Sequence, residues 1–240
     1  MDQGKERTDR FLDSYGNIER FLRKYTQSDK DIRFYGLIEK AGRSNRAVRA
    51  LKDDLKEIGD LRNAIVHERG TGEAIAVPNE KAVNLIEKLR DLVTAPPKVI
   101  PIFQRDVYTC NSKAPIAIAL KAMYKYRYSQ IPIIQDNKFV KLLTANTVTN
   151  WLGSCIADEI FSVMETAIDE VCVYVEDEDN YVIISQDTNV FELIERFQEY
   201  EYAGRKLEAV LITRSGKISE HFLGIATVWD LPRIYEIIKR

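Results

Sequence analysis

The stretch FLGIATVWD (residues 222–230) decides the fold, because a second copy of it, FVKLLTANT (139–147), occurs earlier in the chain. FVKLLT aligns with FLGIAT at an offset of 83 residues, and IPII (131–134) aligns with AVLI (209–212) at an offset of 78. A longer turn in the later copy accounts for the difference. One supersecondary unit is therefore used twice, and such copies usually pack against each other.

Short segments rich in β-branched residues alternate with helical patterns throughout residues 103–240. This alternation predicts an α/β fold. The predicted strands are residues 131–134, 139–143, 181–184, 208–213 and 222–227, and the predicted helices lie near residues 115–126, 190–202 and 228–238. Together with the repeat, the pattern predicts two copies, at about 103–165 and 166–240, related by a pseudo-twofold axis.

The first part of the chain has a different pattern. Apolar residues recur there at helical spacing with charges between them, beginning with Ile18, Phe21, Leu22 and Tyr25. This period predicts an all-α bundle of four or five helices over residues 1–95. The stretch TAPPKVIP (94–101) holds three prolines, which cannot continue a helix and favour an extended connector. We therefore expect two domains joined by a proline-rich linker at residues 96–102.

Composition excludes several classes of protein. The 240 residues include 35 basic and 37 acidic side chains, which leave a net charge of −2. This balance provides no global field that would attract nucleic acid. Cys110, Cys155 and Cys172 are scattered and lack the close spacing of a metal site or a disulfide framework. A polar N-terminus and the lack of a long apolar run predict a cytoplasmic protein without a membrane span.

Thr227 and Asp230 are the first candidate ligand residues. In each copy a strand runs directly into Thr-x-x-x at the start of a helix, from Thr144 to Thr147 and from Thr227 to Asp230. Free N–H groups at a helix N-terminus suit a phosphate, and a carboxylate one turn later can accept both hydroxyls of a ribose. The pattern therefore predicts a ribonucleotide site. The alternative is a helix cap, with Thr227 as N-cap and Asp230 completing a capping box.

Residues 105–240 resemble the CBS-pair family, through the strands IPII and AVLI, the helix start SQDTNVFEL (185–193) and FLGIATVWDLPRI (222–234). The resemblance implies a tandem CBS pair, a disc with two clefts, in which the Thr-x-x-Asp turn closes a cleft on ribose and phosphate. It implies that Thr227 and Asp230 bind an adenine nucleotide, such as AMP or ATP, or a related adenosyl ligand. Ser185 and the backbone near Val210 and Ile225 would face the base.

The first copy departs from this family pattern. Thr147 stands where the second copy has Asp230, and Lys141 stands where it has Gly224. The ribose anchor is therefore missing from the first copy. We expect its cleft to be either empty or specialised.

A second chemical signal lies in DLRNAIVHERG (60–70), near the end of a predicted helix. Asn63 and His67 are four residues apart and share a helix face, which Arg62 flanks. A symmetric dimer would bring Arg62 of one chain near His67 of the other. The stretch resembles the HEPN family motif, which implies a metal-independent ribonuclease. His67 would then act as general acid/base, Arg62 would stabilise the charged transition state, and Asn63 would orient His67 or the phosphate.

A structural role for the same residues stays open. A histidine in the last turn of a helix is favoured by the helix dipole, and Arg62 can pair with Glu57 or Asp60. The helical domain would then be a dimerisation module without catalysis.

YKYRY (124–128) interleaves tyrosines with basic residues, as a stacking surface for nucleic acid would. Its spacing also fits a helix half-packed on a sheet. We favour the packed interpretation.

The sequence therefore predicts a two-domain regulatory sensor, in which a CBS pair binds an adenine nucleotide beside a helical dimerisation or effector domain. The alternative is a ligand-gated ribonuclease with RNA as its substrate. Neither function requires a cofactor or a metal. The helical half is too short to bury every apolar stripe alone, which predicts a homodimer.

Overall fold

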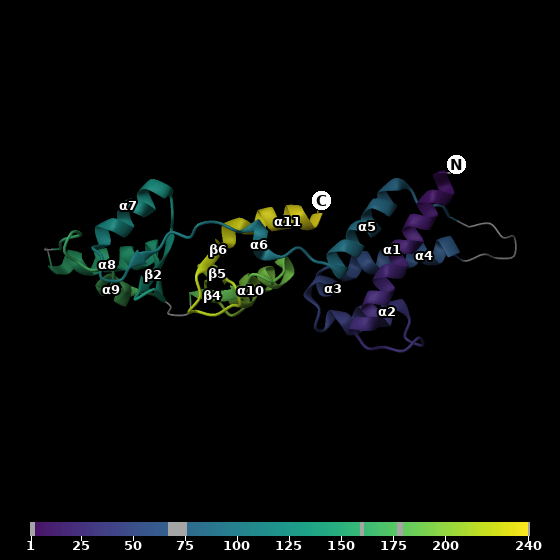
Figure 1. Cartoon of the computed structure of the whole chain (residues 1–240), viewed down its shortest axis with the longest axis horizontal. Coiled ribbons are helices and arrows are strands. Elements are labelled where there is room, and N and C mark those ends of the chain that lie inside the picture. The colour runs from purple at the N-terminus through teal and green to yellow at the C-terminus, as the bar shows by residue number, and fades with distance from the viewer. Residues whose placement is uncertain (1–2, 67–75, 159–160, 177–179, 240) are drawn as a thin grey trace. The chain divides into compact units, whose positions relative to one another are not determined.

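Two separate units make up the computed structural model of the chain, which describes residues 3–66, 76–158, 161–176 and 180–239. The first unit comprises residues 1–97 with 189–192, and the second comprises residues 98–188 with 193–240. Figure 1 labels the helices and strands of both units.

The first unit is helical, as the apolar period predicted. Its helices are α1 (Gln3–Tyr25), α2 (Phe34–Gly42), α3 (Arg46–Ala50), α4 (Lys52–Val66) and α5 (Glu80–Thr94). Two of these helices are preceded by an asparagine whose side-chain oxygen caps the helix start. Asn45 accepts the N–H of Val48 at 3.0 Å before α3, and Asn79 accepts the N–H of Ala82 at 2.9 Å before α5. These caps satisfy N–H groups that a helix start leaves without a partner.

The core of the first unit forms where the apolar stripes of α1 and α5 meet. Ile18 on α1 and Ile86 on α5 are both fully buried. Arg10 adds a polar link between the same helices, since it donates to both carboxylate oxygens of Glu87 at 2.9 Å and to Glu80 at 3.0 Å. Ile18 and Leu22 of the α1 stripe are buried, whereas Tyr25 at its end is 42% exposed. The homodimer that we expected from these stripes stays a prediction.

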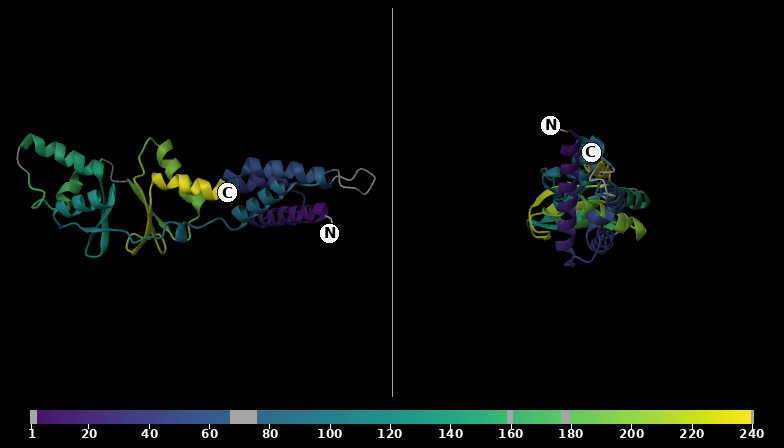
Figure 2. Two further views of the ribbon diagram at one scale, coloured as in Figure 1. Left: turned by 90° about the horizontal axis from the view of Figure 1, so that it is seen from above. Right: turned by 90° about the vertical axis from the view of Figure 1, so that its right-hand side faces the viewer.

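The second unit contains two three-stranded sheets with one topology (Figure 2). The strands are β1 (Cys110–Asn111), β2 (Gln130–Gln135) and β3 (Lys138–Thr144) in the first sheet, and β4 (Tyr181–Ser185), β5 (Ala209–Thr213) and β6 (Phe222–Ala226) in the second. In each sheet the first two strands are parallel and the third is antiparallel to the second. The α/β repeat inferred from sequence is therefore present in three dimensions.

Helices occupy matching places in the two copies. Parallel neighbours need a crossover connection, which α7 (Ile116–Tyr126) and α10 (Val190–Tyr202) provide. The third strand of each copy then leads into α8 (Ala145–Asp158) or, through the short turn η2 (Val228–Asp230), into α11 (Leu231–Lys239). Three further short helices are α6 (Val99–Ile102), α9 (Ile168–Val171) and η1 (Cys172–Tyr174). Ile168, Val171 and Cys172 of α9 and η1 belong to the same core as Cys110 and Ile131 of the first sheet. We therefore refer to residues 103–174 as the first module and to residues 180–240 as the second, which moves the boundary later than the expected position near residue 165.

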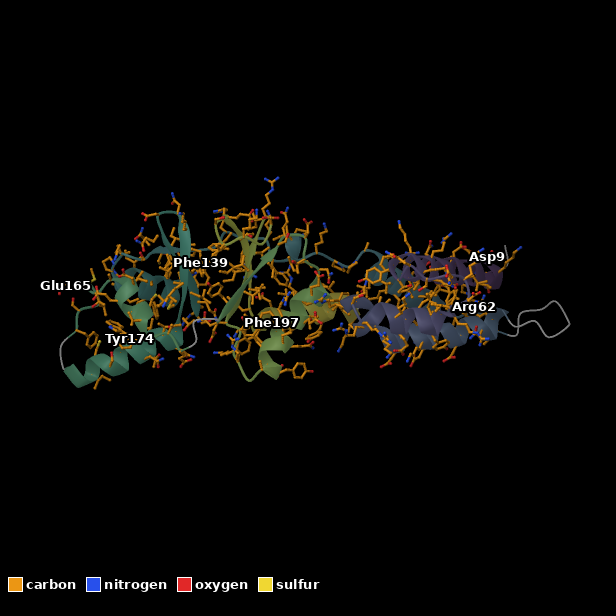
Figure 3. The ribbon with its side chains drawn as sticks, turned by 90° about the horizontal axis from the view of Figure 1, so that it is seen from below. Asp9, Arg62, Phe139, Glu165, Tyr174 and Phe197 are labelled. Atoms are coloured by element: carbon orange, nitrogen blue, oxygen red, sulfur yellow. The ribbon has the colours of Figure 1, made fainter. Side chains whose placement is uncertain are left out.

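The two modules touch through residues that occupy equivalent places in the repeat. Phe139 on β3 lies on the side of the first sheet that faces the second (Figure 3), and its ring centroid is 5.7 Å from that of its counterpart, Phe222. Gln130 donates to its own counterpart, Glu208, at 3.2 Å. Contacts between equivalent positions are those that a twofold relation between copies produces.

The backbone of residues 103–105 runs along β6. Gln104 forms a β-bridge with Gly224, and the Arg105 N–H donates to the carbonyl of Leu223 at 3.2 Å. A Cβ atom at residue 224 would collide with the carbonyl oxygen of Phe103 and would lie 3.0 Å from its carbonyl carbon. Only glycine permits this approach. The same site in the first module holds Lys141.

Gly224→Ala should therefore destabilise the protein. Overpacking against a backbone carbonyl costs about 1–3 kcal/mol, because neither side can move away without breaking strand pairing. Urea unfolding followed by circular dichroism measures this loss. Gly153→Ala on α8 is the matched control, since a Cβ there meets nothing within 4 Å, and the helix should gain up to about 1 kcal/mol. Equal unfolding midpoints for the two variants would contradict the proposed constraint.

Candidate functional site

Thr227 and Asp230 form the capping box that the sequence left as an alternative. Oδ2 of Asp230 accepts the N–H of Thr227 at 2.8 Å and its hydroxyl at 3.2 Å. This arrangement fixes the turn between β6 and α11. The cap uses one of the two carboxylate oxygens, so the other is available for a further interaction.

The second oxygen of Asp230 faces a basic side chain from the other module. Oδ1 accepts a hydrogen bond from Nη2 of Arg105 at 3.2 Å. The Asp230 side chain is 20% exposed, whereas that of Arg105 is 45% exposed. The carboxylate is therefore at the wall of an open cleft and is not enclosed in the core.

This cleft has a volume of about 380 Å³, and both modules line it. We call it the second cleft, because Thr227 and Asp230 belong to the second module. Its lining residues are Arg105, Asp106, Val107, Tyr108, Arg127, Tyr128, Ser129, Gln130 and Pro132 from the first module and Ile225, Thr227, Trp229 and Asp230 from the second. The lining thus combines two arginines, two carboxylates and three large aromatic rings.

The tyrosines near the second cleft form an exposed cluster. The ring centroids of Tyr108, Tyr126 and Tyr128 lie 5.5 to 6.3 Å from one another, and the three side chains are between 36% and 46% exposed. Burial raises the pKa of the Tyr108 phenol. The packed interpretation of YKYRY was wrong for these rings, because α7 ends at Tyr126 and Arg127 adopts a left-handed conformation.

A first cleft of about 570 Å³ is built from equivalent segments with the modules exchanged. Arg205, Lys206, Leu207 and Glu208 line it where Arg127 to Gln130 line the second cleft, and Thr144 and Asn146 take the places of Thr227 and Trp229. The two clefts are therefore products of one repeat.

The Thr-x-x-x turns of the two clefts differ in chemistry. In the first module, Thr147 donates its N–H to Oγ1 of Thr144 at 3.0 Å, and the two hydroxyls lie 2.9 Å apart. Thr144 and Thr147 are both buried. Thr147 thus satisfies the turn internally and presents no carboxylate to the first cleft.

The other predicted ligand residues do not all reach the second cleft. Ile225 lines it together with Thr227. Val210, whose backbone was expected to face the base, pairs with Ala226 of β6 and is not among the residues that line the cleft. Ser185 lies at the other end of the sheet, where it pairs with Thr213 and donates to the carbonyl of Arg214 at 3.2 Å. The structure therefore brings Thr227, Asp230 and Ile225 together and places Ser185 apart from them.

Arg105, Tyr108, Arg127 and Tyr128 were missed as site residues by sequence reasoning. Each belongs to the first module, about 100 residues from Thr227. The basic and aromatic composition of YKYRY was the one signal that pointed to part of this set.

The candidate catalytic residues lie in the first unit. Arg62 and Asn63 are both on α4, and Nη1 of Arg62 lies 3.4 Å from Oδ1 of Asn63. The Arg62 guanidinium, labelled in Figure 3, sits 5.5 Å from the ring centroid of Tyr15. His67 lies outside the described residues. In the described part of the chain, no cluster of three or more His, Cys, Asp or Glu side chains could hold a metal.

Residues 90–154 match the family model of the CBS domain. The matched stretch includes β1, α7, β2 and β3 and ends within α8. The chain therefore contains a CBS domain at these residues. None of the helices in the described ranges has the length and apolar character that a bilayer crossing needs.

Several solved structures are similar to this chain. The CBS domain pair of protein MJ0100, in complex with 5′-methylthioadenosine and S-adenosyl-L-methionine, is 18% identical, with 59% of this chain and 97% of that chain covered and a TM-score of 0.42. CBSX2 in complex with AMP is 14% identical, with 60% and 99% covered and a TM-score of 0.43. A CBS domain-containing protein of unknown function from Kribbella flavida DSM 17836 is 12% identical, with 55% and 95% covered and a TM-score of 0.41. No curated protein matches the sequence.

Proposed function

We propose that residues 103–240 form a tandem CBS pair with pseudo-twofold symmetry, which binds an adenine nucleotide in the second cleft and regulates the helical domain. One observation carries the proposal: the Thr227–Asp230 turn faces a cleft that also contains arginine and tyrosine side chains. A volume of about 380 Å³ is within the range of small-ligand pockets, roughly 300–1,000 Å³.

Each part of a nucleotide has a partner of suitable chemistry in this cleft. Oδ1 of Asp230 is an acceptor for ribose hydroxyls. Tyr108, Tyr128 and Trp229 offer ring faces on which a purine can stack. Arg105 and Arg127 supply positive charge for a phosphate. The first cleft lacks the carboxylate, so we expect the nucleotide to prefer the second cleft.

Asp230→Asn should weaken AMP binding by about 1.5–3 kcal/mol, roughly 10- to 150-fold, the range for a hydrogen bond to a charged group. Asparagine keeps the size of the side chain and can still accept the Thr227 N–H, so the cap persists. Isothermal titration calorimetry measures the affinity.

Thr147→Val is the matched control for Asp230→Asn. It removes a buried hydroxyl from the equivalent turn and should lower stability by about 1 kcal/mol without changing AMP affinity. Equal losses of AMP affinity in the two variants would refute the assignment of the nucleotide to the second cleft. So would a lack of nucleotide binding by the wild-type chain.

We propose that the protein is a homodimer held by its second unit. Apolar side chains are exposed around α8 and η1, including Ile156 at 74% and Val173 at 74%. Exposed apolar surface of this kind is typical of an association site. Light scattering should give about 55 kDa, twice the 27.7 kDa of one chain. A mass of one chain at micromolar concentration would exclude this assembly.

The ribonuclease alternative for Arg62, Asn63 and His67 stays a prediction. If it holds, the protein cuts single-stranded RNA in excess EDTA, and His67→Ala abolishes cleavage because the general acid/base is lost. Arg62→Ala should have nearly the same effect, since the transition state loses its counter-charge. Circular dichroism controls for folding. Cleavage that survives in His67→Ala would rule out this mechanism, and a dimerisation module would show no RNA phenotype at all.

A further inference from the structure

Both oxygens of the Asp230 carboxylate have partners in the structure. Oδ2 holds the cap at Thr227, and Oδ1 accepts from Arg105. Oδ1 has two acceptor sites, one of which Arg105 uses. A ribose that places both of its hydroxyls on Oδ1 must therefore displace the Arg105 guanidinium. The ligand determines what this displacement costs, because the guanidinium then needs a new anionic partner or must return to water.

The backbone of Arg105 is held in place beside the cleft. Gln104 and Arg105 pair with β6, and Gly224 allows the neighbouring Phe103 carbonyl to approach. The Arg105 side chain is 45% exposed, so it can change partner without a backbone movement. A side chain with a fixed backbone and a solvent-exposed guanidinium suits an exchange between two anions.

We propose that Arg105 makes the second cleft selective for nucleosides that carry a phosphate. This inference rests on the proposed function and specifies its ligand. In the free protein Arg105 binds Asp230. When the nucleotide binds, the ribose hydroxyls take Oδ1 and the guanidinium transfers to the phosphate, so one charge-assisted hydrogen bond replaces another.

Other adenosyl ligands match the displaced arginine less well. Adenosine displaces Arg105 and provides no anion in return. S-adenosylmethionine offers one carboxylate, but its ammonium and sulfonium groups leave a net positive charge, which the nearby cations Arg105 and Arg127 repel. The remaining charged groups of the cleft are Asp106 and Asp230, and Asp230 is occupied by the ribose in the bound state. A phosphate therefore provides the charge that best matches the displaced arginine.

The test compares AMP, adenosine and S-adenosylmethionine on the full-length chain by isothermal titration calorimetry. The wild-type protein should bind AMP about 10- to 100-fold more tightly than adenosine, which corresponds to one charge-assisted interaction. Arg105→Gln should reduce this ratio to about 3 or less, with adenosine affinity unchanged or increased. Arg105→Lys keeps the charge but replaces the planar guanidinium with a compact ammonium, so its ratio of AMP to adenosine affinity should lie between those of the wild type and Arg105→Gln.

Arg196→Gln is the control for loss of one positive charge. Arg196 pairs with Glu199 on α10, and its side chain is 44% exposed, close to the value for Arg105. This variant should keep the wild-type ratio of AMP affinity to adenosine affinity. Raised salt should weaken AMP binding more in the wild type than in Arg105→Gln.

Each other outcome overturns the proposal in an identifiable way. Equal affinities of wild-type protein for AMP and adenosine would refute the role of Arg105 and leave the adenosine site intact. Equal weakening of both ligands in Arg105→Gln and Arg105→Lys would assign the residue to folding and refute selection. If none of the three compounds binds, the proposed function fails, and the inference fails with it.

Discussion

The second unit depends on the close approach of the Phe103 carbonyl to Gly224 in β6. Only a residue without a Cβ atom permits this contact. It fixes the start of the first module, residues 103–105, against an edge strand of the second module. Because β6 would otherwise present unpaired backbone groups, the segment also covers a strand edge. The position of Arg105, and with it one wall of the second cleft, follows from this pairing.

The repeat explains why there are two clefts, and the differences between copies explain why they are unlike. Equivalent segments line both clefts with the modules exchanged. In the second cleft the turn ends in a carboxylate, whereas in the first it ends in the buried hydroxyl of Thr147. Gly224 admits a neighbouring backbone, whereas Lys141 brings a side chain to the same place. A duplicated fold therefore presents one cleft whose turn carries a carboxylate and one cleft whose turn lacks it.

The periodic elements were predictable from sequence, because alternation and turn residues are local signals. The predicted strand at 139–143 corresponds to β3, Lys138–Thr144, and the predicted helix at 190–202 corresponds to α10. The lining of the second cleft was not predictable, because Arg105 and Tyr128 meet Thr227 only through tertiary packing. The position of Ser185 was likewise not predictable from local sequence. Its place at a helix start suggested a ligand residue, but strand direction puts it beside Thr213.

In the proposed nucleotide complex, Asp230 connects the stability of a helix start with ligand binding. If the ribose takes Oδ1 while Oδ2 keeps the Thr227 cap, the start of α11 is unchanged by the ligand, and Arg105 is the group that changes partner. Arg105 lies eight residues after Pro97, where the chain first passes from the first unit to the second. In the proposed sensor, the side chain that responds to the nucleotide is therefore close in sequence to the connection with the helical domain. A ligand shifts a conformational equilibrium only through groups whose interactions differ between the free and bound states. Arg105 is such a group in the proposed sensor, so a signal to the helical domain would begin with its change of partner.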